Sequence, residues 1–156
     1  MPGEFYFMSM GGLGLSLAGF AGLIAALGPS GEHPEIGAWR IVNIVKSGLL
    51  VTFLGFGTIA VTAVTDVPLS VRIISGIAAI AVFRLTEMAT RAGPAWPDDQ
   101  ERVGSRRLLL ATPLLIIPNV ILGSVGYLHV ILIGLLALPA GTLVTAVGGL
   151  TERHTT

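Results

Sequence analysis

The sequence predicts an all-α fold, a polytopic bundle of transmembrane helices that forms one domain over residues 1–156. Hydrophobic residues make up 53% of the chain and charged residues only 12%, whereas a soluble domain has about 25% charged residues. A soluble protein of this length needs a large polar surface, and so few polar side chains could not supply it. The apolar residues also gather in runs of about 20, the length of helix that crosses the hydrocarbon core of a bilayer.

The apolar runs predict five spans. The last run, from Leu108 to Leu150, contains no Asp, Glu, Lys or Arg. As one helix it would be about 65 Å long, roughly twice the hydrocarbon thickness, so it must hold two spans. We expect the turn between them at Gly123–Gly126, where glycine and serine are densest near the middle of the run. The predicted spans are residues 5–27, 41–64, 69–90, 108–122 and 127–150.

The fourth predicted span is the least regular. It is short and contains Pro113, Pro118 and Asn119, and proline inside a helix removes a backbone donor and bends or breaks the helix. A re-entrant segment at this position is the alternative. The chain would then have four full spans plus the re-entrant segment.

The positions of the basic residues predict the orientation. Lys and Arg close to the ends of spans favour the cytoplasmic side. With five spans, the loop 28–40, the arginine-rich loop 91–107 and the tail with Arg153 all lie on one side, whereas four spans would move Arg153 to the other. We therefore predict an outer N-terminus, a cytoplasmic loop at 91–107 and a cytoplasmic C-terminus, in a multi-pass protein of the cell membrane.

Two predicted spans carry small residues at every fourth position. Such rows allow two helix backbones to approach closely, which matters in lipid because no hydrophobic force draws apolar helices together. The rows predict helix-packing interfaces, either inside the monomer or with another subunit. Their residues are Gly14, Ala18, Gly22 and Ala26 in the first span, and Ala137, Gly141, Thr145 and Gly149 in the last.

Ionisable residues at membrane depth are costly and indicate candidate functional positions. Arg84 and Glu87 are three residues apart, so they share a helix face and can pair. Lys46 lies about 7 Å inside the second span, and the short turn between spans two and three makes these spans antiparallel neighbours. Lys46, Arg84 and Glu87, with Asn43 one turn before Lys46, can therefore form either the mouth of an ion or solute pathway or a structural salt-bridge group near the headgroups.

Two further polar residues flank the predicted turn between the last two spans. Asn119 follows Pro118, whose ring frees a backbone carbonyl, and His129 lies just after the turn. Irregular backbone of this kind lines water or substrate sites in some membrane proteins. The two residues are interpreted either as the outer end of a pathway or as a polar turn near the outer headgroups.

Several classes of function are disfavoured by what the sequence lacks. The chain has no cysteine and a formal net charge of zero, which excludes thiol chemistry and argues against nucleic-acid binding. Its histidines are far apart, at His33, His129 and His154, without the spacing of metal ligands. No hydrolase, zinc-protease or phosphate-binding motif is present, so we expect no enzyme activity, no cofactor and no metal site.

Two hypotheses for function remain, of which the sequence favours the first by a small margin. The first is an oligomeric channel or transporter for ions or small solutes, made of several copies because five helices hardly enclose a wide pathway. The alternative is a non-catalytic membrane subunit or scaffold that binds another membrane protein or lipid. Transport predicts that Glu87 and Asn119 face a solvated cavity or a subunit axis, whereas a scaffold places them in a packed interface or among headgroups.

Overall fold

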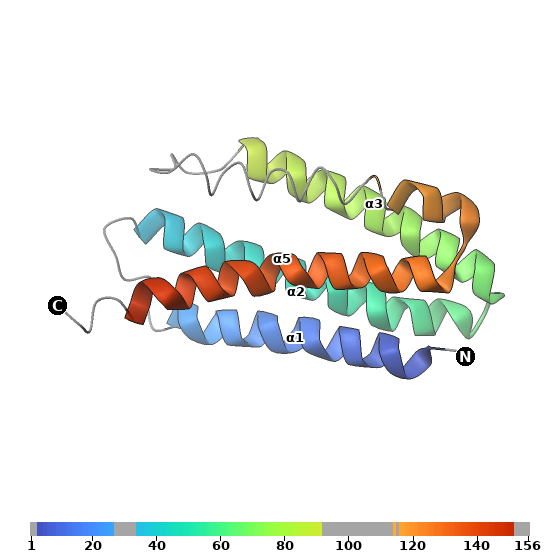
Figure 1. Cartoon of the computed structure of the whole chain (residues 1–156), viewed down its shortest axis with the longest axis horizontal. Coiled ribbons are helices and arrows are strands. Elements are labelled where there is room, and N and C mark those ends of the chain that lie inside the picture. Colours follow the sequence, from blue (N-terminus) through green and yellow to red (C-terminus); the bar gives the residue numbers. More distant parts are fainter. Residues whose placement is uncertain (1–2, 27–33, 92–113, 115, 152–156) are drawn as a thin grey trace.

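The computed structural model describes residues 3–26, 34–91, 114 and 116–151, and it confirms the all-α prediction. The described residues form four long helices, which run roughly side by side (Figure 1). Residues 116–122 form a further short helical segment before the last long helix. Nearly all of the predicted loop 91–107 lies outside the described residues. The long helices are α1 (Glu4–Ala26), α2 (Pro34–Thr62), α3 (Val67–Arg91) and α5 (Val125–Thr151).

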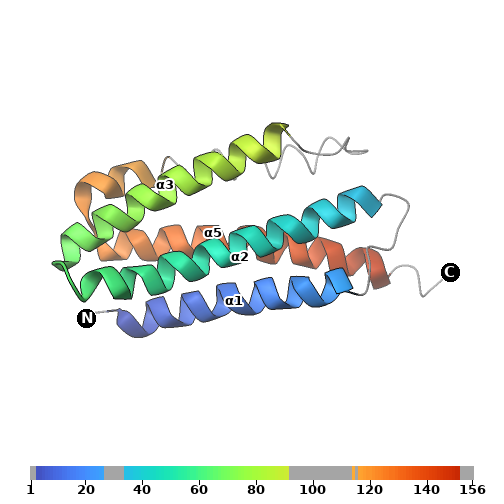
Figure 2. The same ribbon diagram turned by 180° about the vertical axis from the view of Figure 1, so that it is seen from behind.

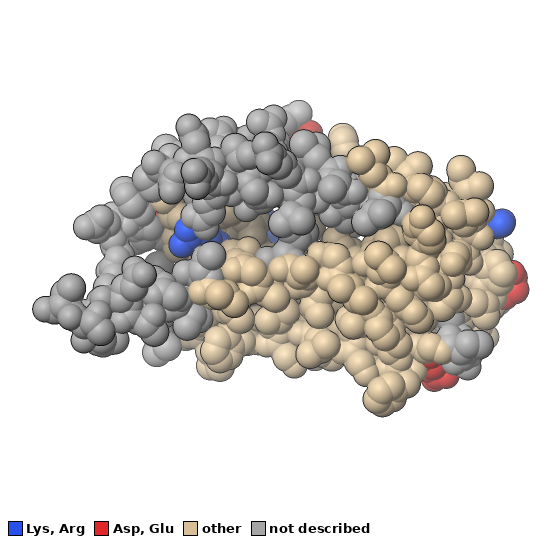
Figure 3. All heavy atoms as spheres, viewed as in Figure 1, with Lys and Arg blue, Asp and Glu red and all other residues tan. Residues whose placement is uncertain are grey.

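The surface of the described bundle is apolar. All four long helices are long and apolar enough to cross a membrane. Large apolar side chains such as Phe5, Phe53 and Ile121 are 84%, 73% and 74% exposed. In Figure 3 the described surface carries no charge over the middle of the molecule, and charged atoms lie towards its ends and beside the undescribed residues. Such a surface is suited to lipid as solvent, which indicates a membrane protein; five spans and their orientation remain predictions.

Helix α2 begins well before the predicted start of its span at Ile41. Proline is favourable in the first turn of a helix, where its missing N–H would have no partner, and Pro34 occupies this position. Glu35 follows it and stabilises the positive end of the helix dipole. The helix therefore extends beyond its apolar run, through Trp39, a residue type that favours the membrane–water interface.

A tight turn joins α2 to α3. Asp66 caps α3: its side-chain Oδ2 accepts a hydrogen bond from the Leu69 N–H at 3.4 Å, and its carbonyl accepts one from the Ser70 N–H at 3.0 Å. The turn makes α2 and α3 antiparallel neighbours, as the sequence predicted. In Figures 1 and 2 the two helices separate with increasing distance from this turn.

Helix α2 is the centre of the bundle, in contact with α1, α3 and α5. The main core lies between these helices and the segment 116–122, and a smaller apolar cluster joins α1 to the first half of α2. The largest fully buried apolar side chains are Phe7, Ile44, Leu54, Ile116, Leu128, Ile131 and Leu132.

Glycines allow the backbones of α1 and α2 to touch. A Cβ atom added to Gly14 would lie 2.5 Å from the carbonyl oxygen of Gly48, and one added to Gly48 would lie 2.7 Å from the carbonyl oxygen of Gly14. A Cβ on Gly55 would lie 2.7 Å from the carbonyl oxygen of Phe7. These contacts are with backbone atoms, which cannot rotate aside, so no larger residue fits without moving a helix.

The buried face of α1 has a different period from the predicted row. Its buried residues are Phe7, Gly11, Gly14, Ala18 and Ala21, at alternating spacings of four and three. This seven-residue repeat keeps one face against a neighbouring helix. A row with strict four-residue spacing instead turns by about 40° per step around a helix of 3.6 residues per turn.

The predicted row in the first span is therefore divided between two faces. Gly14 and Ala18 are buried against α2, whereas Gly22 and Ala26 are exposed. No heavy atom lies within 4 Å of a Cβ built at Gly22. Contact of Gly22 and Ala26 with another molecule stays a prediction.

Thr52 supplies a polar contact in the α1–α2 interface. Its buried hydroxyl lies 3.0 Å from the carbonyl oxygens of both Gly11 in α1 and Gly48 in its own helix. We expect Thr52→Val to lower the free energy of unfolding by about 0.5–1.5 kcal/mol, because interhelical hydrogen bonds in membranes contribute about this much. Detergent-induced unfolding followed by circular dichroism measures the change.

The matched control is Thr58→Val. The Thr58 hydroxyl is also buried, but it donates to Leu54 of its own helix. We expect a smaller loss of stability for this variant. Equal losses for the two variants would show that the contact of Thr52 with α1 adds no stability.

Candidate functional site

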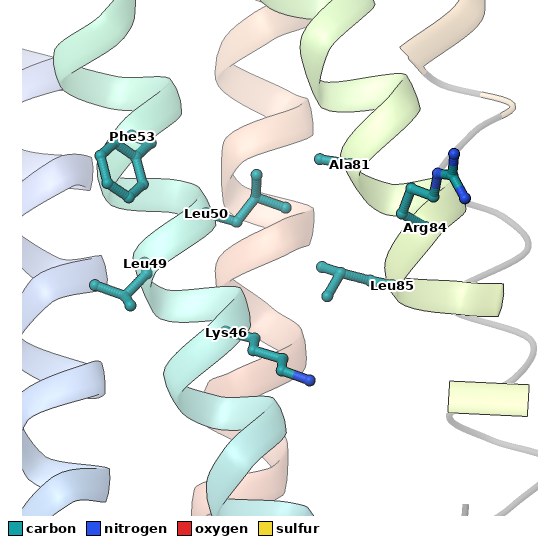
Figure 4. Close-up of a pocket in the computed structure, with 7 residues that line it drawn as sticks. All are labelled: Lys46, Leu49, Leu50, Phe53, Ala81, Arg84 and Leu85. Atoms are coloured by element: carbon teal, nitrogen blue, oxygen red, sulfur yellow. The ribbon is translucent and has the colours of Figure 1, made fainter. Parts of the chain in front are cut away.

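An open groove of about 420 Å³ lies between α2 and α3, where the two helices separate. Its walls are apolar side chains from both helices, and two cationic side chains, Lys46 and Arg84, also line it (Figure 4). The apolar lining residues are Leu49, Leu50, Phe53, Ala81 and Leu85.

Charge and apolar surface are ordered along the groove. On α2, Lys46 comes first and Phe53 lies two turns further on. On the antiparallel α3 the order is reversed, so Ala81 precedes Arg84. Because the helices run in opposite directions, both cations lie at the same end of the groove, and the other end is apolar.

The two cations are oriented differently. Figure 4 shows the Lys46 ammonium pointing into the space between α2 and α3, while the Arg84 guanidinium points away from Lys46. Arg84 Nη1 lies 3.4 Å from Glu87 Oε2, which is the predicted pair within α3. The Arg84 side chain is 71% exposed, and such exposed pairs are weak. Within the described chain Lys46 has no ion pair, so it does not join Arg84 and Glu87.

Asn43 lies one turn before Lys46 on α2 and is partly buried. Its side-chain nitrogen Nδ2 is buried and has no hydrogen-bond partner among the described residues. A buried donor without a partner costs free energy, so a site of this kind favours an acceptor supplied from outside the described chain.

Asn119 is a structural link between helices. It is fully buried. Its Nδ2 donates to the Ser75 hydroxyl on α3 at 2.9 Å, and its Oδ1 accepts from the backbone N–H of Ser124 at 2.9 Å. Both ends of the amide are therefore used to hold the segment 116–122 against α3 and to fix the turn before α5.

The turn after this segment depends on Gly123. Its φ of +64° is in the left-handed region, and its N–H donates to the carbonyl of Asn119 at 2.9 Å, a helix-ending arrangement typical of glycine. A Cβ at this position would also lie 2.9 Å from the carbonyl oxygen of Pro68. The chain thus turns within the predicted Gly123–Gly126 stretch, and α5 begins at Val125.

His129 joins α5 to α1. Its ring centroid lies 4.0 Å from that of Tyr6 and 4.9 Å from that of Phe7, and the Tyr6 hydroxyl donates to the His129 carbonyl at 3.1 Å. Its Nε2 is buried without a hydrogen-bond partner in the described part of the chain. His129 therefore packs against α1, whereas Asn119 packs against α3, and the two residues are in separate contacts.

Four small residues were predicted to form an interface on the last span. The two whose burial the structure describes lie away from the core. Ala137 and Gly141 are exposed, and a Cβ at Gly141 would have no heavy atom within 4 Å. The surroundings of Thr145 and Gly149 lie outside the description. An interface on this face stays a prediction.

Lys46 and Arg84, the cations of the groove, are candidate residues from the sequence alone, whereas the apolar residues that line its walls are not. Leu50, Ala81 and Leu85 stand in apolar runs where nothing distinguishes them from residues that face lipid. The useful signal was the short turn, which placed α2 beside α3. No local pattern shows that the two helices then diverge.

Comparisons of the chain with protein families, curated proteins and solved structures found no match. The structure itself gives the class of protein: its described helices are long and apolar enough to span a membrane, which suggests a helical membrane protein, and two of them form an apolar groove that carries cations at one end. The described residues contain no group of three His, Cys, Asp or Glu that could hold a metal ion.

Proposed function

We propose that this chain is a non-catalytic membrane subunit that binds a hydrophobic partner within the bilayer. The groove between α2 and α3 carries the proposal, because it combines apolar walls with a cation, Lys46, that forms no ion pair with any of the described residues. Apolar sites with few polar groups are typical of binding sites for hydrophobic molecules. The rigid contact of α1 with α2, through paired glycines, provides a fixed support for one wall of the groove.

Transport by an oligomer is the competing function. It requires Glu87 and Asn119 to face a solvated pathway, but Asn119 is buried and both ends of its amide are hydrogen-bonded within the bundle. Glu87 is near Arg84 on the same helix. These contacts support the subunit over the transporter.

The flux of ions and solutes in liposomes tests the proposed function. We expect liposomes with the purified, inserted protein to show no more flux of protons, cations, anions or small neutral solutes than empty liposomes. Lys46→Met and Glu87→Gln are expected to leave this background unchanged, because neither residue lines a pathway. Circular dichroism and protease protection establish that the protein is folded and inserted, and a known pore-forming peptide shows that the assay detects flux.

Flux that requires the protein and changes with Lys46→Met or Glu87→Gln would contradict the proposal. That result would establish transport and would place the pathway along α2 and α3. The variant Arg72→Gln removes a cation near the other end of α3. If its flux equals that of the wild type, the effect is specific to the residues of the groove.

A further inference from the structure

We propose that the groove between α2 and α3 binds an acyl chain of an anionic phospholipid, with the lipid phosphate held by Lys46. This inference rests on the proposed function and names the chemical class of the partner. Three observations carry it: the shape and lining of the groove, a lysine at one end that pairs with no acid among the described residues, and the order of charge along its length.

The apolar walls suit an acyl chain. Leu50 and Leu85 point towards one another across the groove, and Ala81 leaves space between them (Figure 4). Space beside a helix in a bilayer is accessible to lipid tails from the side. Atoms that line an unfilled space lose dispersion contacts on that side, so a tail that fills the groove restores them.

The polar groups suit a phosphate. The Lys46 ammonium points into the gap, and in the described chain it pairs with no acid. A phosphate group supplies both a negative charge and several acceptor oxygens.

Arg84 provides a second, weaker cation. Arg84 lines the groove, but its guanidinium points away from Lys46 (Figure 4). Its Nη1 pairs with Glu87 Oε2 at a long distance of 3.4 Å, and its side chain is 71% exposed. Rotation of this long side chain towards a phosphate therefore costs little free energy from the broken ion pair. We expect Lys46 to contribute more to lipid binding than Arg84 does.

The order of charge along the groove matches the order of charge in a phospholipid. Lys46 lies nearer than Phe53 to the end of α2 that carries Trp39 and Arg40, residue types that favour the membrane–water interface. The apolar part of the groove runs from there towards the middle of the span. A lipid with its headgroup at the interface would bring its phosphate to Lys46, whose stem can extend towards the headgroups, and its tail to Phe53 and Ala81.

Native mass spectrometry of the full-length chain tests the inference. The protein, released from micelles that contain equal amounts of phosphatidylglycerol and phosphatidylcholine, is expected to retain phosphatidylglycerol about tenfold more often. Lys46→Gln is expected to remove most of this preference and Arg84→Gln a smaller part. The control Arg72→Gln, which removes an exposed cation near the turn before α3, is expected to change it by less than about twofold.

A second variant tests the apolar wall separately. Ala81→Trp fills the groove but leaves Lys46 in place, so it is expected to reduce retention of both lipids at least fivefold. Circular dichroism and an unchanged elution volume show that the variant is folded. Ala60→Trp, at an exposed position of α2 outside the groove, is the matched control and is expected to retain both lipids as the wild type does.

Equal retention of the two lipids by the wild type, or equal losses with Lys46→Gln and Arg72→Gln, would overturn the inference. A dimer that Ala81→Trp abolishes, without lipid retention, would also overturn it and would assign the groove to a second copy of the chain. The liposome assay keeps the two proposals separate. Selective lipid retention together with flux would contradict the subunit function alone, whereas no flux and no retention would contradict the lipid site alone.

Discussion

Replacement of Gly14 by leucine is expected to lower the free energy of unfolding by about 3 kcal/mol or more, the largest single effect in the α1–α2 interface. Overpacking of a buried site typically costs about 1–3 kcal/mol, and more when the neighbours cannot move. Here the first side-chain carbon would already lie 2.5 Å from the Gly48 carbonyl oxygen and 3.0 Å from the Thr52 backbone nitrogen. The leucine therefore has to push α1 away from α2.

The same substitution at Gly22 is the control. Gly22 lies on the same helix, about two turns further on, and a Cβ there meets no heavy atom within 4 Å. Both variants change the intrinsic helix propensity equally, so their difference isolates the contact with α2. Unfolding in mixed micelles with increasing sodium dodecyl sulfate, followed by circular dichroism, measures both free energies. Similar values for Gly14→Leu and Gly22→Leu would mean that the two backbones are not in contact.

Asn119→Leu is expected to cost about 2–4 kcal/mol, although leucine has nearly the shape of asparagine. The substitution removes two hydrogen bonds of 2.9 Å from a fully buried side chain. It also leaves the Ser75 hydroxyl and the Ser124 N–H without these partners, and each unsatisfied buried group costs about 1–3 kcal/mol. The same unfolding titration in micelles gives the value.

Asn43→Leu is the matched control for this prediction. Its side-chain Nδ2 has no partner within the described bundle, so its removal is expected to change stability by less than about 1 kcal/mol, in either direction. A double-mutant cycle of Asn119→Leu with Ser75→Ala isolates the contact between the two side chains. Strictly additive losses would show that the hydrogen bond from Asn119 to Ser75 contributes nothing to stability.

The two variants act on different parts of the bundle. Gly14 holds α1 against α2, whereas Asn119 holds the segment 116–122 against α3. Because α3 forms one wall of the groove, Asn119→Leu is also expected to weaken lipid retention. Gly22→Leu leaves both walls untouched and is expected to retain lipid normally.

The amino-acid sequence by itself indicated a lipid environment, and it predicted the helical secondary structure and several local contacts. Composition and run length are sums over neighbouring residues, so the long apolar helices could be recognised without knowledge of the fold. The pairing of Arg84 with Glu87 depends only on spacing within one helix, and the turn at Gly123 depends on a glycine that can adopt a positive φ.

Only the tertiary structure decided which faces of the helices meet. Small residues stay in contact with a neighbouring helix only if their spacing keeps them on the face that meets this neighbour. A strict four-residue spacing does not, so Gly14 is buried and Gly22 is exposed on the same helix. The irregular sequence around Asn119 indicates either a pathway or a polar turn, whereas the partner of its side chain, Ser75, lies far away in the chain.

The groove, likewise, could not be predicted from the sequence. A short turn requires α2 and α3 to be neighbours, but it does not set the angle at which they leave the turn. That angle is the result of contacts of each helix with the rest of the bundle, among residues distant in sequence. It opens the space beside Lys46 and thereby creates the candidate site.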